Sequence, residues 1–139
     1  MQGANSFVLD SYALIGYLEN ESFSDQIQHA LTQAKNGAFR LYFHAIHLGE
    51  VYYITLREQG QSLAGLAYSR IKALPIKLID RIDEELLLAA AGLKARHPIS
   101  YADSFAAALA MINNCPLLTG DLEFRSLEKQ GIISIEWLT

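Results

Sequence analysis

The chain has 139 residues, of which 51% are hydrophobic and 19% are charged. This length and apolar content suit one domain with a buried core, so we expect a single domain over residues 1–139. Fifteen acidic residues against 11 basic ones give a formal charge of −4, which argues against general adhesion to DNA or to anionic membranes. The lone cysteine, Cys115, excludes an internal disulfide and fits a reducing compartment.

The apolar runs of the chain are too short for a membrane span. Residues 86–93 and 105–112 are two such runs, and both fall well short of the roughly 20 residues that a transmembrane helix needs. The first residues also lack the basic region that opens a signal peptide. The sequence therefore predicts a soluble, cytoplasmic protein that does not bind membranes.

The first apolar run ends at a carboxylate, and a helical pattern follows at once. Residues 7–9 (FVL) suit a strand buried on both faces, and apolar residues recur at helical spacing over 11–18. Asp10 is thus expected at the carboxyl end of a central strand. In open α/β sheets ligands bind outside these strand ends, which makes Asp10 a candidate site residue, although capping of the following helix explains it about as well.

The next part of the chain predicts two helices around a strand, and then a further helix. Ser24 is the expected N-cap of the second helix, and residues 39–43 (FRLYF) are expected to form a strand. The helix that follows is expected from about Leu48, with Glu50 in its first turn. Residues 62–73 continue as another helix, so these two helices should form a hairpin set off from the strands.

The second half of the chain continues the alternation. A short strand over 75–79 precedes a helix opened by Asp83, and Pro98 ends that helix. Ser100 and Asp103 have the spacing of an N-cap and the third residue of an alanine-rich helix, which must be buried nearly all round. A strand, a short helical turn and a last strand are expected over 116–119, 124–128 and 132–137. This order predicts a parallel α/β sheet with right-handed crossovers.

Four acids stand at junctions between the predicted elements, namely Asp10, Glu50, Asp103 and Asp121. In a parallel sheet the strand ends and the following helix starts share one edge, so three of these acids should converge there, and Asp103 joins them if its helix begins at the same rim. Gathered carboxylates repel one another, and a divalent cation reverses that effect. Hard oxygen ligands suit Mg²⁺ or Mn²⁺. Two such ions roughly 4 Å apart could activate water and stabilise the leaving oxygen in phosphodiester cleavage.

Structural roles would also account for these acids one by one. Asp103 fits a capping-box position, and Glu50 and Asp121 could be first-turn acids favoured by the helix dipole, each worth about 0.3–1 kcal/mol. Two further classes of protein fit the residues less well. A phosphatase of the haloacid dehalogenase type would need a second Asp where this chain has Tyr12. A phospho-acceptor receiver domain would need paired acids at the first strand, and the chain does not supply that pair.

Four segments of the chain carry a more specific pattern: VLDSYALIGYL, HLGEVYYI, ISYADSFAAALA and LLTGDLEF. In their order and approximate spacing they resemble the PIN domain, in particular the small toxin nucleases of VapBC toxin–antitoxin pairs. The resemblance implies a three-layer α/β/α fold with a central parallel sheet of four to five strands. It also implies a Mg²⁺- or Mn²⁺-dependent ribonuclease, usually a homodimer, that an antitoxin inhibits by placing its tail in the active-site groove.

The same resemblance implies that the metal site consists of Asp10, Glu50, Asp103 and Asp121. Ser11 and Thr119 match hydroxyl positions that support the first acid or the metal waters, and Glu123 matches a second, more variable acid. His44 and His47 precede the helix acid, and His47 has the spacing of a mixed metal pair with it. A histidine near a helix start is nevertheless more often a hydrogen-bonding or surface residue.

The acidic charge of the chain does not favour binding to RNA. Affinity for RNA would have to come from the bound metal and from local basic groups such as Arg40, Lys94, Arg96 and Arg125. A non-enzymatic alternative is a catalytically silent PIN-like module that serves as a dimerisation or partner-binding unit. Retention of all four acids argues against that alternative, because uncompensated carboxylates destabilise a fold.

Overall fold

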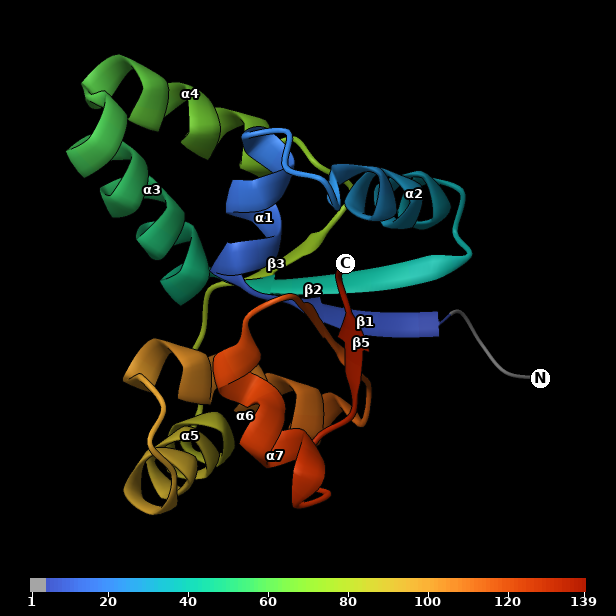
Figure 1. Ribbon diagram of the computed structural model, residues 1–139, viewed down its shortest axis with the longest axis vertical. Coiled ribbons are helices and arrows are strands. Elements are labelled where there is room, and N and C mark those ends of the chain that lie inside the picture. Colours follow the sequence, from blue (N-terminus) through green and yellow to red (C-terminus); the bar gives the residue numbers. More distant parts are fainter. Residues whose placement is uncertain (1–4) are drawn as a thin grey trace.

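The computed structural model describes residues 5–139 as strands alternating with helices (Figure 1). The strands are β1 (Asn5–Leu9), β2 (Phe39–His44), β3 (Lys77–Ile79), β4 (Leu117–Thr119) and β5 (Ile135–Trp137). The helices are α1 (Ser11–Leu18), α2 (Ser24–Lys35), α3 (Ala45–Gln59), α4 (Gln61–Lys72), α5 (Glu84–Arg96), α6 (Tyr101–Asn113) and α7 (Arg125–Lys129), with a 3₁₀ turn, η1 (Leu122–Phe124), before α7. The predicted element order is confirmed.

The five strands of residues 5–139 are all parallel, in the spatial order β3-β2-β1-β4-β5. Strand β1 lies at the centre, where Val8 pairs with Tyr42 of β2 and with Leu117 of β4. Along the chain, β2 and β3 are added on one side of β1, and β4 and β5 are then added on its other side. The point between β1 and β4 is a topological switch point, the place where open α/β sheets bind their ligands.

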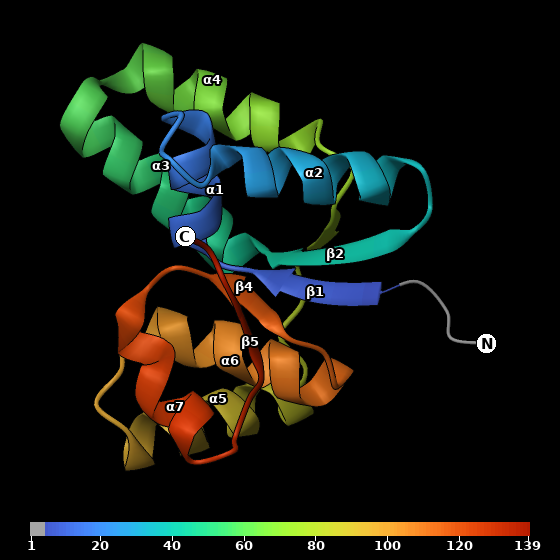
Figure 2. The same ribbon diagram turned by 45° about the vertical axis from the view of Figure 1, so that its right-hand side comes forward.

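Helices cover both faces of the sheet, which confirms the three-layer expectation. Helices α1 to α4 lie on one face and α5 to α7 on the other (Figures 1 and 2). The two-residue period of the strands explains how one strand serves both layers. Val8 and Leu117 pack into the core under α5 and α6, whereas Leu9 and Leu118 pack into the core under α1 and α2.

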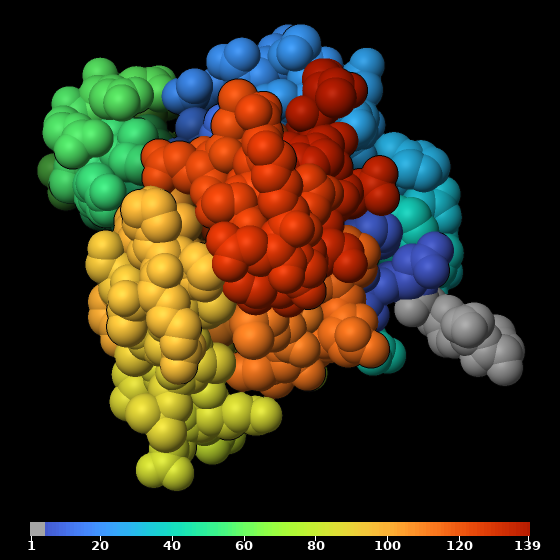
Figure 3. Space-filling model, turned by 60° about the horizontal axis from the view of Figure 1, so that its bottom comes forward, coloured from blue at the N-terminus to red at the C-terminus, as the bar shows by residue number. Residues whose placement is uncertain are grey.

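Helix α6 is the most deeply buried helix, as its composition predicts. Every residue from Ser104 to Ala110 is buried, and all of them except Phe105 and Leu109 are alanine or serine. Small side chains allow the helix axis to lie close to the sheet. Figure 3 shows the outer face of this layer, with the residues of α5 in yellow, α6 in orange and α7 in orange-red.

Helices α3 and α4 form the predicted hairpin beside the sheet (Figure 1). Gly60 joins them with a φ of +95°, a conformation that glycine adopts without strain. None of the helices in residues 5–139 combines the length and the apolar composition that crossing a membrane requires.

Some predicted boundaries are wrong, and the hydrogen bonds show why. Helix α3 begins at residue 45 rather than near Leu48, because the His44 side chain accepts a backbone N–H and caps it. Glu50 consequently lies in the second turn, not the first. Ser24 is the first residue of α2 rather than its N-cap, and its hydroxyl donates to Asn20 Oδ1 at 3.1 Å. The edge strands β3 and β5 are also shorter than predicted, with three residues each.

Candidate active site

Asp10 lies at the switch point, directly after β1, and caps α1. Its Oδ1 accepts the backbone N–H of Ala13 at 3.0 Å, and its Oδ2 accepts the Thr119 hydroxyl at 2.6 Å. The side chain is only 2% exposed. Burial raises the pKa of Asp10 to about 7, with repulsion from Asp103 and Asp121 adding to the rise, while the two hydrogen bonds oppose it. Each carboxylate oxygen has a second lone pair that a cation could use.

Glu50 reaches the same edge from α3. The hydroxyl of Ser11, the first residue of α1, donates to Glu50 Oε1 at 3.0 Å. Burial is the main cause that raises the pKa of Glu50, and repulsion from Asp121 contributes in the same direction. The Ser11 hydrogen bond therefore connects the helix that follows β1 with the helix that carries the second acid.

Asp103 reaches the edge from the opposite helical layer. It lies in the first turn of α6, where its backbone N–H donates to the Ser100 hydroxyl at 3.0 Å, so the predicted N-cap is confirmed. Burial raises the pKa of Asp103 to about 7, and repulsion from Asp121, Glu50 and Glu123 adds to the rise. Helix α6 thus begins at the rim where the other acids lie.

Asp121 completes the group from the end of β4. Its backbone N–H donates to Thr119 Oγ1 at 3.0 Å, and its Oδ1 accepts the N–H of Glu123 at 3.0 Å, which caps η1. The Thr119 hydroxyl therefore accepts from the Asp121 backbone and donates to Asp10. Glu123 itself is exposed and acts on the group through its repulsion of Asp103.

The two histidines make contacts that the sequence did not specify. His44 uses both ring nitrogens on backbone groups: Nδ1 accepts from Ile46 N, and Nε2 lies 2.9 Å from Arg81 O. His47 is fully buried, and its Nε2 lies 2.8 Å from Ala102 O. A carbonyl only accepts, so this nitrogen carries the proton. The spacing of His47 suggested a pair with the helix acid, but its ring nitrogen bonds to α6 instead.

His47 is also electrically neutral near pH 7. Burial lowers its pKa to about 4, and the nearby His44 contributes to the fall. Its Nδ1 is buried and has no hydrogen-bond partner within the described part of the chain. No periodicity marks this residue in the sequence, since the contact that defines it joins positions 55 residues apart.

The donor chemistry of the edge fits a hard divalent cation. Among residues 5–139, no three His, Cys, Asp or Glu side chains stand as a ready-made ligand set for a metal ion. Four carboxyl groups nevertheless interact there, and each of the three with a raised pKa is repelled by at least one of the others. A cation would offset this repulsion and favour the ionised carboxylates. Oxygen donors of this kind suit Mg²⁺ and Mn²⁺.

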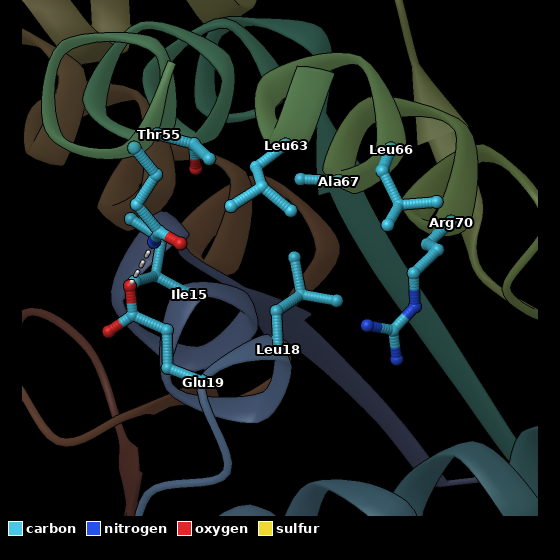
Figure 4. Close-up of a pocket in the computed structure, with 9 residues that line it drawn as sticks. Ile15, Leu18, Glu19, Thr55, Leu63, Leu66, Ala67 and Arg70 are labelled. Atoms are coloured by element: carbon cyan, nitrogen blue, oxygen red, sulfur yellow. Dashed lines mark hydrogen bonds between the residues drawn. The ribbon is translucent and has the colours of Figure 1, made fainter. Parts of the chain in front are cut away.

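Two adjoining hollows lead away from the acids along α1. The first, of about 430 Å³, is lined by Ser11, Tyr12 and Asp121 at the acid end. The second, of about 400 Å³, lies between α1 and the α3–α4 hairpin (Figure 4). Ile15 and Glu19 line both, so we treat the two adjoining hollows, which lie along α1 between the acids and α4, as one groove. We call it the α1 groove.

The far end of the α1 groove is largely apolar. Leu18 of α1 and Leu63 of α4 project into it from opposite sides, and Arg70 lies beyond them (Figure 4). Gln59, the last residue of α3, donates to Glu19 Oε2 at 3.2 Å. A segment bound in this groove would therefore contact leucine side chains at one end and carboxylates at the other.

These features define a class of protein: a doubly wound parallel α/β domain with a cluster of carboxyl groups at its switch point. A family model described as PIN domain matches residues 7–130. The chain belongs to the PIN domain family.

Solved structures agree with this assignment at the level of the fold. The VapBC2 structure from Rickettsia felis bound to a promoter DNA fragment has a TM-score of 0.74 at 14% identity, with 96% of this chain and 99% of that chain covered. DNA-bound VapBC from Salmonella typhimurium also has a TM-score of 0.74, at 16% identity, covering 97% and 99%. VapC20 from Mycobacterium tuberculosis, a sarcin-ricin loop cleaving toxin, has a TM-score of 0.66 at 15% identity, covering 88% and 94%. No curated protein sequence matches the chain.

Proposed function

We propose that the protein is a VapC-type toxin that cleaves RNA phosphodiester bonds as an endoribonuclease with Mg²⁺ or Mn²⁺ bound at the four acids. The observation that carries this proposal is that Asp121 lies close enough to repel Asp10, Glu50 and Asp103 at the switch point, where the Thr119 and Ser11 hydroxyls orient two of these acids. Four separate segments supply these carboxyl groups, and packing alone does not require them to meet. The described activity of VapC20, which shares the fold, supports the same conclusion.

In this proposal Asp10, Glu50, Asp103 and Asp121 hold the cation, while hydroxyl groups orient them. Thr119 fixes one oxygen of Asp10, and Ser11 fixes one oxygen of Glu50. A bound divalent cation would activate water and stabilise the leaving oxygen of the phosphodiester. Because the pKa values of Asp10 and Asp103 are raised to about 7, both must be deprotonated before they can bind the ion.

The basic residues expected to help bind RNA are not equally placed. Arg40 is the second residue of β2 and pairs with Ser6, so it lies near the amino ends of the strands, away from the acids. Arg125 starts α7 immediately after the turn that Asp121 caps. Lys94 braces the segment before α6 by donating to Ile99 O at 2.8 Å. We therefore favour Arg125 as the side chain that attracts RNA phosphates. An RNA substrate also implies that the protein is cytoplasmic.

We also propose a cognate antitoxin as the partner, and the α1 groove as the surface that it occupies. The structures from Rickettsia felis and Salmonella typhimurium are toxin–antitoxin assemblies. Leu66 is 53% exposed at the apolar end of the groove, and the acid end opens at Asp121. An antitoxin segment with apolar side chains, followed by a basic group, would match both ends and cover the acids. A homodimer is the proposed oligomeric state, by analogy with the family.

Cleavage of purified cellular RNA, with mapping of the new ends, tests the activity. We expect discrete cuts with Mn²⁺ or Mg²⁺ and none with EDTA. A catalytically silent module would instead bind the partner and leave RNA intact under both conditions. Cleavage that persists in EDTA would rule out the metal mechanism.

A further inference from the structure

The acids of the candidate site are divided between the two helical layers. Glu50 is on α3, which lies on one face of the sheet, whereas Asp103 is on α6, which lies on the other (Figures 1 and 2). Backbone hydrogen bonds of the sheet do not connect these helices to each other. A metal site that uses both acids needs a direct connection between the layers at this edge, because ligand distances must be held within a few tenths of an ångström.

His47 supplies such a connection. Its Nε2–H donates to the carbonyl oxygen of Ala102 at 2.8 Å, across 55 residues of sequence. Ala102 directly precedes Asp103, and His47 precedes Glu50 by three residues, about one helical turn. The bond therefore ties the turn of α3 that carries one acid to the turn of α6 that carries another.

The other ring nitrogen of His47 shows that packing does not explain the residue. Nδ1 is buried without a partner among residues 5–139, an arrangement that costs about 1–3 kcal/mol. The imidazole ring of His47 packs against other rings: its centroid lies 6.1 Å from the ring centroid of Phe43 and 6.3 Å from that of His44. Phenylalanine would fill this site without an unsatisfied nitrogen. What histidine adds is the hydrogen bond from Nε2.

We propose that His47 is a positioning residue of the metal site, whose hydrogen bond to Ala102 sets the separation of Glu50 and Asp103. This inference rests on the proposed function, since it concerns the same acids. His47 acts through the two helices and does not contact the ion. Its role differs from that of the mixed metal pair suggested by its spacing.

Two substitutions separate this role from simple packing. His47→Phe keeps a buried ring and removes the hydrogen bond, whereas His47→Gln keeps an amide N–H that can reach Ala102 O. The measurements are the melting temperature in EDTA and a calorimetric titration with Mn²⁺. We expect His47→Phe to melt in EDTA at or above the wild-type temperature and to bind Mn²⁺ about 10–100-fold more weakly. His47→Gln should recover most of the affinity.

Ser24→Ala is the matched control, because it removes a part-buried side-chain hydrogen bond at the start of α2, a helix that carries no site acid. Its Mn²⁺ affinity should equal that of the wild type. If His47→Phe does not fold, His47→Leu replaces it in the comparison. The positioning role of His47 would be overturned if His47→Phe or His47→Leu bound Mn²⁺ as tightly as the wild type, or if His47→Gln did not recover the affinity. Either result would leave the proposed function standing. Absence of Mn²⁺ binding by the wild type would instead overturn the proposed function.

Discussion

The Thr119 hydroxyl donates to Asp10 Oδ2 at 2.6 Å, although the two residues are 109 positions apart. The same oxygen of Thr119 accepts the backbone N–H of Asp121 at 3.0 Å, so the direction of both hydrogen bonds is fixed. Thr119 is fully buried at the end of β4, beside the end of β1. One hydroxyl thus orients the first acid and holds the segment that carries the last.

Substitution of Thr119 should impair activity, and the loss should depend on the hydroxyl group. Thr119→Val keeps the shape of the side chain and removes its O–H group, so Asp10 loses the partner that orients it. We expect kcat/KM for RNA cleavage to fall by about 10–100-fold, the usual effect of losing a group that orients a metal ligand. Thr119→Ser keeps the hydroxyl and should retain most activity. Equal activity in the valine and serine variants would contradict this role.

Asp10→Asn and Asp103→Asn should abolish metal-dependent cleavage without unfolding the protein. In the wild type, Mn²⁺ at 100 times its Kd should stabilise the fold by about 2.7 kcal/mol, and this gain should largely disappear in both variants. Thermal melts with and without Mn²⁺ measure the difference. Asp25→Asn, an exposed first-turn substitution on α2, is the control and should behave like the wild type. Identical metal-induced shifts in all four proteins would mean that the ion binds elsewhere.

The stability of the metal-free protein should fall as the pH rises. Asp10 and Asp103 titrate near pH 7 in the folded state, against a reference value of 3.8. Between these values the folded state holds protons that the unfolded state has released, so raising the pH favours unfolding. The stability that these two protonated carboxyl groups contribute is fully present below about pH 4 and is lost as the pH passes about 7. The expected decrease in Tm is on the order of several degrees.

Melting curves in EDTA from pH 5 to pH 8 test this dependence. Asp10→Asn removes one of the two titrating groups and should flatten the curve. The increase in Tm caused by added Mn²⁺ should instead grow with pH, because the ion binds the ionised carboxylates. A metal-free Tm that rises between pH 5 and pH 8 would contradict the assigned protonation states.

A charge in the α1 groove should weaken binding of the proposed antitoxin without affecting cleavage. Leu66→Glu places a carboxylate on the apolar end of the groove, whereas Leu88→Glu places one on α5, in the other layer, where the side chain is 63% exposed. We expect Leu66→Glu to weaken binding of the proposed antitoxin by about 2 kcal/mol or more, and copurification of the two proteins would detect this loss. Leu88→Glu should bind normally. The reverse result would place the partner on the opposite face.

Gly16 and Gly49 should respond in opposite ways to alanine. A Cβ at Gly16 would lie 2.0 Å from the Phe23 ring, so Gly16→Ala should destabilise the fold by roughly 1–3 kcal/mol. At Gly49 no atom of residues 5–139 lies within 4 Å of an added Cβ, and Gly49→Ala should stabilise α3 by about 0.5–1 kcal/mol. Urea unfolding of the two variants measures both changes. A stable Gly16→Ala would show that the Phe23 ring can move aside.

Much of this architecture follows from the sequence, and the limits are physical. Alternating apolar runs and helical stripes predict the element order, and the parallel sheet then places the acids at one edge. Helix starts are predicted less well, because side-chain caps such as His44 shift them by a few residues. The bond of His47 to Ala102 joins two layers that local periodicity does not relate. Whether Asp103 lies at the same rim likewise depended on how α6 packs, which spacing does not determine.

The pairing of β1 with β4 also decides when the acids can meet during synthesis. Residues 5–9 leave the ribosome long before residues 117–119, so the nascent chain carries its first carboxylate without the strand that holds its partner. No product of translation interrupted before β4 can assemble the complete set. If the proposed function is right, the protein becomes active only after Asp121, the last of the four acids, has been made, which would give a co-produced inhibitor time to be ready.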